Sequence, residues 1–370
     1  MKKNIVIIVS AMNMGGAQRV VSILCNHWSQ NGHNVTLIST FSGNKEHYYQ
    51  LNKDVTLENV IDSPLLSKIK VLNLAWKLIN LRKLIKNQNP DVVISFLARV
   101  NVASALSMIG IQSPLIICER TWPPFASLSN KFLKLYKILF RRADKIIVQT
   151  FKSKDWLTHN FPANTVNVIP NPAVYPVPPS NEKSIKPNVI ISQNKKIILA
   201  SGRLHKYKQF DLLIKAFLKL KEEHLDWDLV ILGNGEEQDN LNHMVVNFGI
   251  TDRVHFPGSV GNMSEWYERA DLFVLSSIVE GFPNVLLEAL TYGLPCISFD
   301  CDTGPRDIIQ DGYNGILVDP NEKELGLSNA IDKIILNQEL RNNLARNSIL
   351  LREKYSIGNI IQKWNNILEI

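Results

Sequence analysis

The sequence contains no run of the roughly 18 to 20 apolar residues that a helix needs to cross a bilayer, so no membrane-spanning segment is predicted. Cysteine is scarce: the 370 residues include 4, whose spacing fits neither a metal site nor a disulfide framework. This usage is typical of a reducing cytosol, and we expect a cytoplasmic protein. Lys2-Lys3 and the apolar residues 5–9 lack the longer apolar region and the cleavage site of a signal peptide, and they predict a buried first strand.

Several motifs of familiar site types are missing. The 8 histidines form no H-E-x-x-H pattern, and neither G-x-S-x-G nor a Walker A loop occurs. Residues 14–19 (MGGAQR) follow the first strand but do not match the G-x-G-x-x-G fingerprint of dinucleotide enzymes. Asp300 and Asp302 have the D-x-D spacing of some metal sites, but a lone D-x-D is frequent, and we assign it to a turn. We expect neither a metal ion nor a cofactor.

Charge is unevenly distributed along the chain. Residues 1–175 carry 21 basic and 8 acidic residues, a net charge of +13, whereas residues 176–370 carry 20 and 26, a net charge of −6. Two segments, 67–87 and 130–145, interleave lysine and arginine with large apolar residues. Both predict helices that cover a sheet, and their basic faces suit an anionic membrane surface on the inner side of the cell membrane. A nucleic-acid partner is not expected, because no recognition motif or stacking platform accompanies the charge.

Short apolar runs alternate with helical patterns on both sides of a proline-rich stretch. The predicted strands are residues 5–10, 35–40, 92–96, 115–118, 146–149 and 166–169 before it, and 196–202, 229–233, 254–256, 272–276, 295–299 and 315–318 after it. This alternation indicates an α/β protein with two doubly wound parallel-sheet domains, which would face one another across a cleft. We place the domains at residues 1–175 and 190–354, with a linker at 176–189 and a C-terminal helix, 355–370, that completes the first domain.

The segment from Glu280 to Glu288 places two carboxylates eight residues apart across the start of a helix. An apolar strand precedes it, and Pro283-Asn284 are favourable residues at a helix entry. The N–H groups of such a start favour an anionic phosphate, and flanking carboxylates can accept hydrogen bonds from ribose and sugar hydroxyls. The ordinary alternative is a pair of solvated carboxylates. We favour nucleotide-sugar binding.

Two cations follow the first strand of the second half. Arg203 and Lys208 lie at its C-terminal end, where an arginine fork and a lysine point charge can neutralise a diphosphate. Glycines at 15 and 16 would likewise let a ligand approach the start of an early helix closely.

The order of these motifs resembles glycosyltransferase family 4, whose members are retaining sugar-nucleotide transferases of the GT-B fold. The motifs that carry the resemblance are Gly15-Gly16, Gly202-Arg203 with Lys208, Val254-x-Phe256-x-Gly258, Glu280-x7-Glu288 and the segment 304–315 (GPRDIIQDGYNG). Together they span nearly the whole chain. The spacing Glu280-x7-Glu288 downstream of Gly202-Arg203 and Lys208 is the specific part.

The resemblance implies a role for each residue. Arg203 and Lys208 would hold the donor diphosphate and stabilise its departure, Glu288 would bind the ribose, and Glu280 would face the donor sugar. Further expected donor contacts are Gly16, Phe256, Gly258, Phe282, Pro283, Asn284, Val285 and Leu286. Many family members have a histidine after the strand 115–118, where this chain has Glu119-Arg120, so these two residues are candidates for contact with the sugar or the acceptor.

The sequence thus predicts a retaining transferase that moves a hexose or N-acetylhexosamine from a UDP-sugar to an acceptor hydroxyl. The expected acceptor is a lipid-linked saccharide of bacterial polysaccharide or glycan biosynthesis. Two alternatives remain open: a hydrolysing UDP-sugar epimerase of the same architecture, and a basic, non-catalytic nucleic-acid-binding protein.

Overall fold

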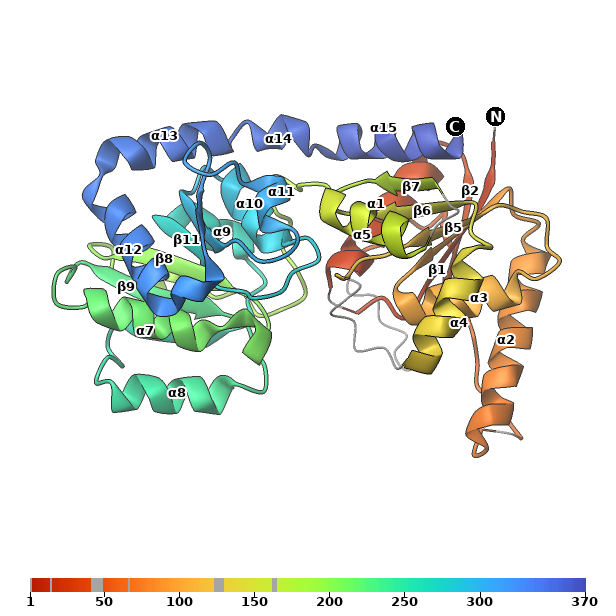
Figure 1. Ribbon diagram of the computed structural model, residues 1–370, viewed down its shortest axis with the longest axis horizontal. Helices are drawn as coiled ribbons and strands as arrows, with labels where there is room; N and C mark the ends of the chain where they lie inside the picture. Colours follow the sequence, from red (N-terminus) through yellow and green to blue (C-terminus); the bar gives the residue numbers. More distant parts are fainter. Residues whose placement is uncertain (1, 14, 41–48, 66, 123–129, 162–164) are drawn as a thin grey trace. The chain divides into compact units, whose positions relative to one another are not determined.

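The computed structural model describes residues 2–13, 15–40, 49–65, 67–122, 130–161 and 165–370, with only the backbone of residues 130–134. The chain divides into two compact units (Figure 1). The first unit comprises residues 1–171 and 360–370, and the second comprises residues 172–359.

The first unit is built on a seven-stranded parallel sheet. Its strands, in chain order, are β1 (Asn4–Val9), β2 (Asn34–Ser39), β3 (Thr56–Asn59), β4 (Val92–Phe96), β5 (Leu115–Cys118), β6 (Lys145–Val148) and β7 (Thr165–Val168). They are arranged as β3-β2-β1-β4-β5-β6-β7. Its helices are α1 (Gly16–Gln30), α2 (Lys70–Asn87), α3 (Ala98–Ser107), α4 (Asn130–Phe140), α5 (Phe151–Asn160) and most of α15 (Ile357–Leu368).

The second unit repeats this plan with six parallel strands. They are β8 (Lys196–Ser201), β9 (Trp227–Leu232), β10 (Val254–Gly258), β11 (Leu272–Leu275), β12 (Cys296–Phe299) and β13 (Ile316–Val318), in the order β10-β9-β8-β11-β12-β13. The α-helices are α6 (Pro187–Ile190), α7 (Phe210–Leu220), α8 (Gln238–Asn247), α9 (Met263–Arg269), α10 (Asn284–Thr291), α11 (Pro305–Ile308), α12 (Lys323–Leu336), α13 (Gln338–Ser348) and α14 (Leu351–Lys354). Two 3-10 helices, η2 (Lys206–Lys208) and η3 (Pro320–Glu322), complete it.

The predicted strands are present, because a parallel strand covered on both faces has an almost unbroken apolar sequence. All five residues of β4 and all six of β9 are buried. The strand β3 is missing from the predictions. It lies at the sheet edge beside β2, with three of its four residues exposed, so its sequence, TLEN, carries no apolar signal.

The proline-rich segment is part of the second unit. Asn262 receives a hydrogen bond from the Ile185 amide at 2.9 Å and donates one to the Ile185 carbonyl at 3.1 Å, and the indole of Trp266 donates to the same carbonyl. The Val177 amide donates to the hydroxyl of Tyr292 at 2.8 Å. Residues 176–189, expected to form a linker, therefore pack as an integral part of this unit, and the division between units falls at residues 171 and 172.

The C-terminal helix α15 packs on the first unit. Trp364 is fully buried, and the Trp28 indole donates to Asn365 Oδ1 at 3.0 Å. The ammonium groups of Lys3 and Lys145 bond to the carbonyls of Leu368 and Ile367 at the end of the helix. Cations are favoured there, at the negative end of the helix dipole.

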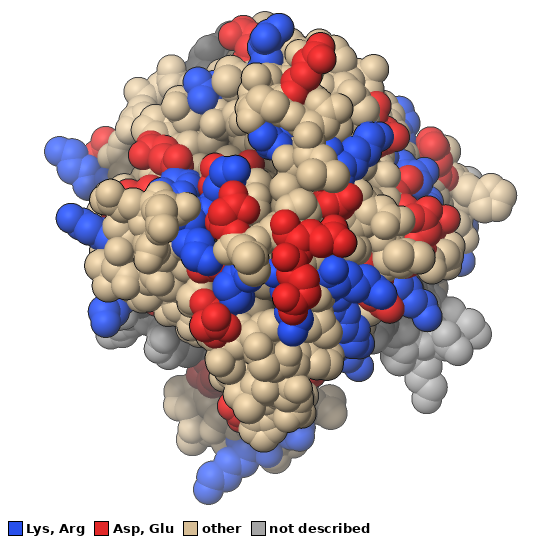
Figure 2. Space-filling view, turned by 90° about the vertical axis from the view of Figure 1, so that its left-hand side faces the viewer, with Lys and Arg blue, Asp and Glu red and all other residues tan. Residues whose placement is uncertain are grey.

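Basic and acidic side chains are interspersed on the face of the second unit that Figure 2 shows. This mixture agrees with the modest net charge of the C-terminal half of the sequence. Within the described residues, no helix is both long enough and apolar enough to cross a membrane.

Candidate functional site

The predicted cations and Glu280 meet at the point where the strand order of the second sheet reverses. Strands β8 and β11 are neighbours, but the chain continues from β8 toward β9 on one side and from β11 toward β12 on the other. The loops at their carboxyl ends therefore diverge, and such a switch point is where doubly wound sheets bind ligands. Arg203 and Lys208 follow β8, whereas Glu280 follows β11 and leads into α10.

An ion pair joins the two loops. Lys208 Nζ lies 2.6 Å from Glu280 Oε1, and both side chains are largely buried, at 22% and 11% exposed. Two further bonds reinforce the contact: the Ser276 hydroxyl donates to the Lys208 carbonyl at 2.7 Å, and the Ile278 amide donates to the Tyr207 carbonyl at 3.0 Å. Charge-assisted hydrogen bonds in a water-poor setting are stronger than neutral ones, so this pair holds the loops in register.

Arg203 has a different partner. Its Nη2 lies 3.0 Å from Glu236 Oε2, while His205 Nε2 lies 3.2 Å from the other oxygen of the same carboxylate. The Arg203 side chain is 71% exposed, so this pair is weak and the guanidinium can change partner at little cost. A backbone hydrogen bond has the largest effect on the pKa of Glu236 and lowers it, and the nearby charges of Arg203 and His205 lower it further.

Glu236 is a site neighbour that the sequence did not identify. It follows Gly233-Asn234-Gly235 after β9, a pattern that also occurs in ordinary turns. The close approach of two loops explains the first glycine: Gly233 has φ +132°, and a Cβ there would lie 2.0 Å from the Gly202 carbonyl oxygen. The turn after β9 therefore packs against the turn after β8. Glu236 comes directly after the Gly233-Asn234-Gly235 turn in the sequence, and this position is the signal that could have predicted it as a site neighbour.

The helix α10 begins as predicted, with Pro283 at its N-cap. The Thr303 hydroxyl donates to the Glu280 carbonyl, and Gly304 lies so close that a Cβ would be 2.6 Å from Pro283 Cδ. The amides of Leu286 and Leu287 bond to the Pro283 carbonyl at 3.2 and 3.1 Å. A phosphate at this helix start would therefore use amides earlier in the segment 282–286, and a role for the Leu286 amide would require its helical bond to open.

Glu288 lies one helical turn further on and is buried, with 6% of its surface exposed. The Tyr267 hydroxyl donates to its Oε2 at 3.0 Å. Tyr267 also lies beside Tyr292, with ring centroids 5.2 Å apart. The structure thus separates Glu288, which has a tyrosine partner, from Glu280, which has a lysine partner.

Phe256 and Gly258 end the strand β10. The Gly258 carbonyl accepts the Gly233 amide at 2.9 Å, which places the end of β10 beside the Gly233 turn, and Phe256 packs partly against the core. Gly16 is the first residue of α1 in the first unit, where the Gly15 amide donates to the Tyr49 hydroxyl at 3.3 Å. The donor-contact roles of these residues remain predictions.

Glu119 and Arg120 lie in a buried polar network at the carboxyl end of β5. The Asn101 amide donates to Glu119 Oε1 at 2.5 Å and accepts from the Ser95 hydroxyl at 2.8 Å. Arg120 donates to Asn171 Oδ1 at 3.0 Å, and its guanidinium stacks over the rings of Phe96 and Trp364. These contacts give both residues a structural role in the first unit; contact with a sugar or an acceptor remains a prediction.

Two other polar features have no role in the proposed donor contacts. Asp300, of the D-x-D pair, forms a two-pronged ion pair with Arg306, with contacts of 2.8 and 2.5 Å.

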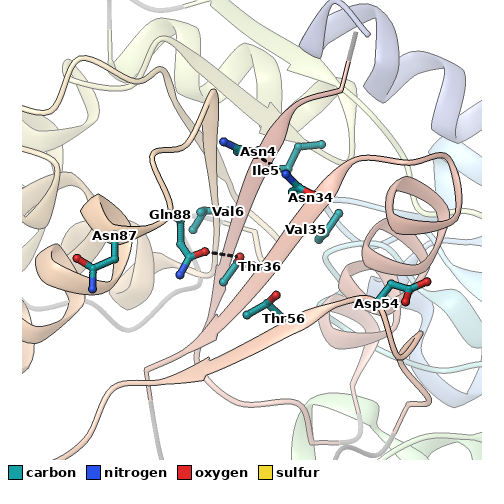
Figure 3. Close-up of a pocket in the computed structure, with 10 residues that line it drawn as sticks. All are labelled: Asn4, Ile5, Val6, Asn34, Val35, Thr36, Asp54, Thr56, Asn87 and Gln88. Carbon is teal, nitrogen blue, oxygen red and sulfur yellow. Dashed lines mark hydrogen bonds between the residues drawn. The ribbon is translucent and has the colours of Figure 1, made fainter.

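A polar hollow of about 330 Å³ lies at the first strands of the first unit, where Thr36 donates to Gln88 Oε1 at 3.1 Å (Figure 3). Its lining includes Asn4 and Asn34, the first residues of β1 and β2, so it opens at the amino ends of the strands, opposite the edge where such sheets bind ligands.

Comparison with known proteins agrees with this geometry. A family model described as "Glycosyl transferases group 1" matches residues 181–350, and one described as "Glycosyltransferase Family 4" matches residues 14–173. An uncharacterised glycosyltransferase of Haemophilus influenzae is 30% identical over the full length of both chains. The amylovoran biosynthesis glycosyltransferase AmsD of Erwinia amylovora is also 30% identical over both full lengths. A Campylobacter jejuni relative, named as a GalNAc-α-(1→4)-GalNAc-α-(1→3)-diNAcBac-PP-undecaprenol α-1,4-N-acetyl-D-galactosaminyltransferase, is 28% identical over 98% of this chain and 97% of its own.

Solved structures confirm the predicted GT-B fold. Sucrose-phosphate synthase from Thermosynechococcus elongatus superposes with a TM-score of 0.85 at 15% identity, covering 99% of this chain and 98% of its own. HepE from Anabaena, solved in complex with UDP, gives a TM-score of 0.79 at 18% identity over all of both chains.

A change at Glu119 should alter how stability depends on pH. Burial raises the pKa of this carboxyl from 4.5 to about 7, against the smaller lowering effects of Tyr136, Asn101 and Arg120. The folded state therefore holds a proton that the unfolded state releases, so stability should fall as the pH rises from 4.5 to 7 and then level off. We expect Glu119→Gln to remove this fall, as measured by urea unfolding between pH 4.5 and 8. The exposed Asp155→Asn is the control, and parallel pH profiles for wild type and Glu119→Gln would contradict the assignment.

Proposed function

Since the chain belongs to glycosyltransferase family 4 and is a transferase enzyme, we propose that it moves a hexose or N-acetylhexosamine from a UDP-sugar to an acceptor hydroxyl, with retention of anomeric configuration. One observation carries the donor assignment: Arg203, Lys208 and the start of α10 converge at the switch point of the second sheet. Two cations and a helix N-terminus suit a diphosphate.

Lys208 has a central role in this proposal. A bound diphosphate would compete with Glu280 for the Lys208 ammonium, which lies 2.6 Å from the carboxylate. As Lys208 turned to the phosphate, Glu280 would accept hydrogen bonds from sugar hydroxyls. Arg203 would leave its exposed pair with Glu236 for the same diphosphate. Donor binding would thus replace ion pairs within the protein by pairs between the protein and the phosphates. This exchange lowers the electrostatic free-energy cost of binding the donor, because no charge is left unpaired.

The main catalytic contribution would come from stabilising the charge that develops on the departing UDP. We assign this role to Lys208 and Arg203, without a divalent metal. Glu280 is assigned to hydrogen bonds with the sugar hydroxyls, and no other residue of the site is assigned as a nucleophile, which favours a front-face reaction. In that reaction the bond from the anomeric carbon to the phosphate oxygen breaks, the acceptor oxygen bonds to that carbon from the same face, and the acceptor proton passes to the leaving phosphate oxygen.

The proposed acceptor is a lipid-linked saccharide of bacterial polysaccharide biosynthesis. The names of the Erwinia and Campylobacter relatives support it: the first acts in amylovoran biosynthesis, and the second is named for an undecaprenol diphosphate substrate. The four cysteines are buried and unpaired, which supports a reducing compartment, and we place the enzyme at the cytoplasmic face of the membrane. The family membership disfavours an epimerase and a non-catalytic nucleic-acid-binding protein.

Removing either cation should abolish most activity. We expect Lys208→Met and Arg203→Ala to lower kcat for transfer from a UDP-sugar by about 10²- to 10³-fold, the usual cost of losing one group that stabilises developing charge. Lys206→Met is a matched control, because Lys206 lies on the same 3-10 helix but its ammonium stacks over Tyr207. Near-normal rates for both site variants, or an equal loss in Lys206→Met, would refute the donor site.

Product analysis tests the reaction type. With α-linked UDP-sugars we expect an α-linked product by NMR of the anomeric proton, formed equally well in the presence of EDTA. Incubation of the donor without an acceptor separates the epimerase alternative. Stoichiometric release of UDP and a free epimerised sugar would support the epimerase, whereas a β-linked product would exclude retention.

A further inference from the structure

Helix α2 buries very little of its apolar surface. Of its 18 residues, only Leu81 and Ile85 are buried. Among the residues that the structure describes, the large apolar side chains exposed on the helix and in the segment before it are Leu65, Ile69, Val71, Leu72, Leu74, Trp76 and Ile79. Soluble proteins rarely leave such a group of large apolar residues exposed together without a partner.

The exposed side chains form an ordered face. Leu72, Trp76, Ile79, Lys83 and Lys86 follow one another at spacings of four, three, four and three residues, so they line one stripe of the helix. This outer stripe lies on the side of the helix away from Leu81 and Ile85. It is apolar in its first half and basic in its second. Trp76 lies between Leu72 and Ile79, and tryptophan favours membrane interfaces.

The N-terminal half of α2 extends beyond the rest of the first unit. Leu74 is on the same side of the helix as Leu81, about two turns earlier, yet it is 58% exposed. Figure 1 shows this end of α2 projecting away from the sheet of that unit. Near its other end Arg82 donates to the carbonyls of Ser107 at 2.8 Å and Ile109 at 2.5 Å. In the N-terminal half, the Asn73 side chain bonds to the segment just before the helix, at Ser63 and Asp62.

The charges of α2 are one-sided. Its sequence from Lys70 to Asn87 contains no acidic residue. Lys77 is paired with Asp62 at 2.7 Å and Arg82 is bound to carbonyls, but Lys68, Lys70, Lys83 and Lys86 are exposed on or beside the helix. A partner for this face therefore has to combine an apolar interior with a negative surface.

Helix α4 differs, although its sequence pattern is similar. Its described side chains Tyr136, Leu139 and Phe140 are buried, and only Leu135 and Ile138 of its described apolar residues are exposed. The two basic amphipathic segments, expected to be similar, therefore differ. The described apolar residues of α4 mostly pack on the first unit, whereas most of those of α2 are exposed to solvent.

We propose that α2, with Leu65 and residues 67–69 before it, docks onto an anionic lipid bilayer. Its outer stripe would insert among the acyl chains near the headgroups, and Lys68, Lys70, Lys83 and Lys86 would pair with lipid phosphates. A nucleic acid would not require the exposed leucine and isoleucine side chains. Only one part of this proposal rests on the proposed function, namely that docking gives access to a lipid-linked acceptor. Binding to the bilayer itself can be measured without any substrate.

Vesicle flotation tests the docking surface. The full chain should float with vesicles of phosphatidylglycerol and phosphatidylcholine and stay unbound with phosphatidylcholine alone, because surface potential adds to the apolar contribution. We expect Leu72→Ser/Ile79→Ser and Lys83→Glu/Lys86→Glu each to weaken binding by about tenfold or more. The matched controls are Val246→Ser/Leu336→Ser and Lys219→Glu/Lys333→Glu, which change exposed residues of the second unit and should bind like the wild type.

Three outcomes would overturn the proposal. One is equal binding by the α2 variants and the controls, and another is no preference for anionic vesicles. The third is a wild-type dimer in sedimentation that Leu72→Ser/Ile79→Ser dissociates, which would assign this face to a second copy of the chain. UDP binding by calorimetry should be unchanged in the folded α2 variants, so a failure of the docking surface is distinguishable from a failure of the donor site.

Discussion

The Lys208–Glu280 ion pair is the interaction on which the candidate site depends. It connects the loop after β8 to the loop after β11, at the point where the strand order of the second sheet reverses. Parallel strands bring these loops to the same edge, and the pair then fixes a cation beside the start of α10. The diphosphate, sugar and ribose contacts that we propose all radiate from this point, so the fold determines the site geometry before any ligand contributes.

Much of this arrangement could be predicted from the sequence, because buried parallel strands and a proline-asparagine helix entry leave strong local patterns. The strand positions and the start of α10 are examples. The pairing of Lys208 with Glu280 was not predictable, since 72 residues separate them and only tertiary structure brings them together. Glu236 was missed for the same reason: its partner Arg203 lies on the neighbouring strand's loop.

The amphipathic segments show a second limit of sequence patterns. Apolar residues at helical spacing predict a helix with one apolar face, but they do not say whether the domain is wide enough to cover that face. In α4 the described aromatic residues Tyr136 and Phe140 are covered, while in α2 Leu72 and Ile79 are not. Glu119 and Arg120 show a related limit. The sequence places these charged residues at the end of a strand, but it does not predict that they belong to a buried polar network.

The most direct test of the account is a double-mutant cycle on UDP affinity, using Lys208→Met, Glu280→Gln and the double variant in calorimetry. If a diphosphate competes with Glu280 for Lys208, Glu280→Gln should strengthen UDP binding more when Lys208 is present than when it is replaced. The predicted coupling free energy is about 0.5 to 3 kcal/mol, as expected for groups in contact. Effects that add to within about 0.3 kcal/mol would contradict the central claim, because they would show that the two residues act on UDP independently.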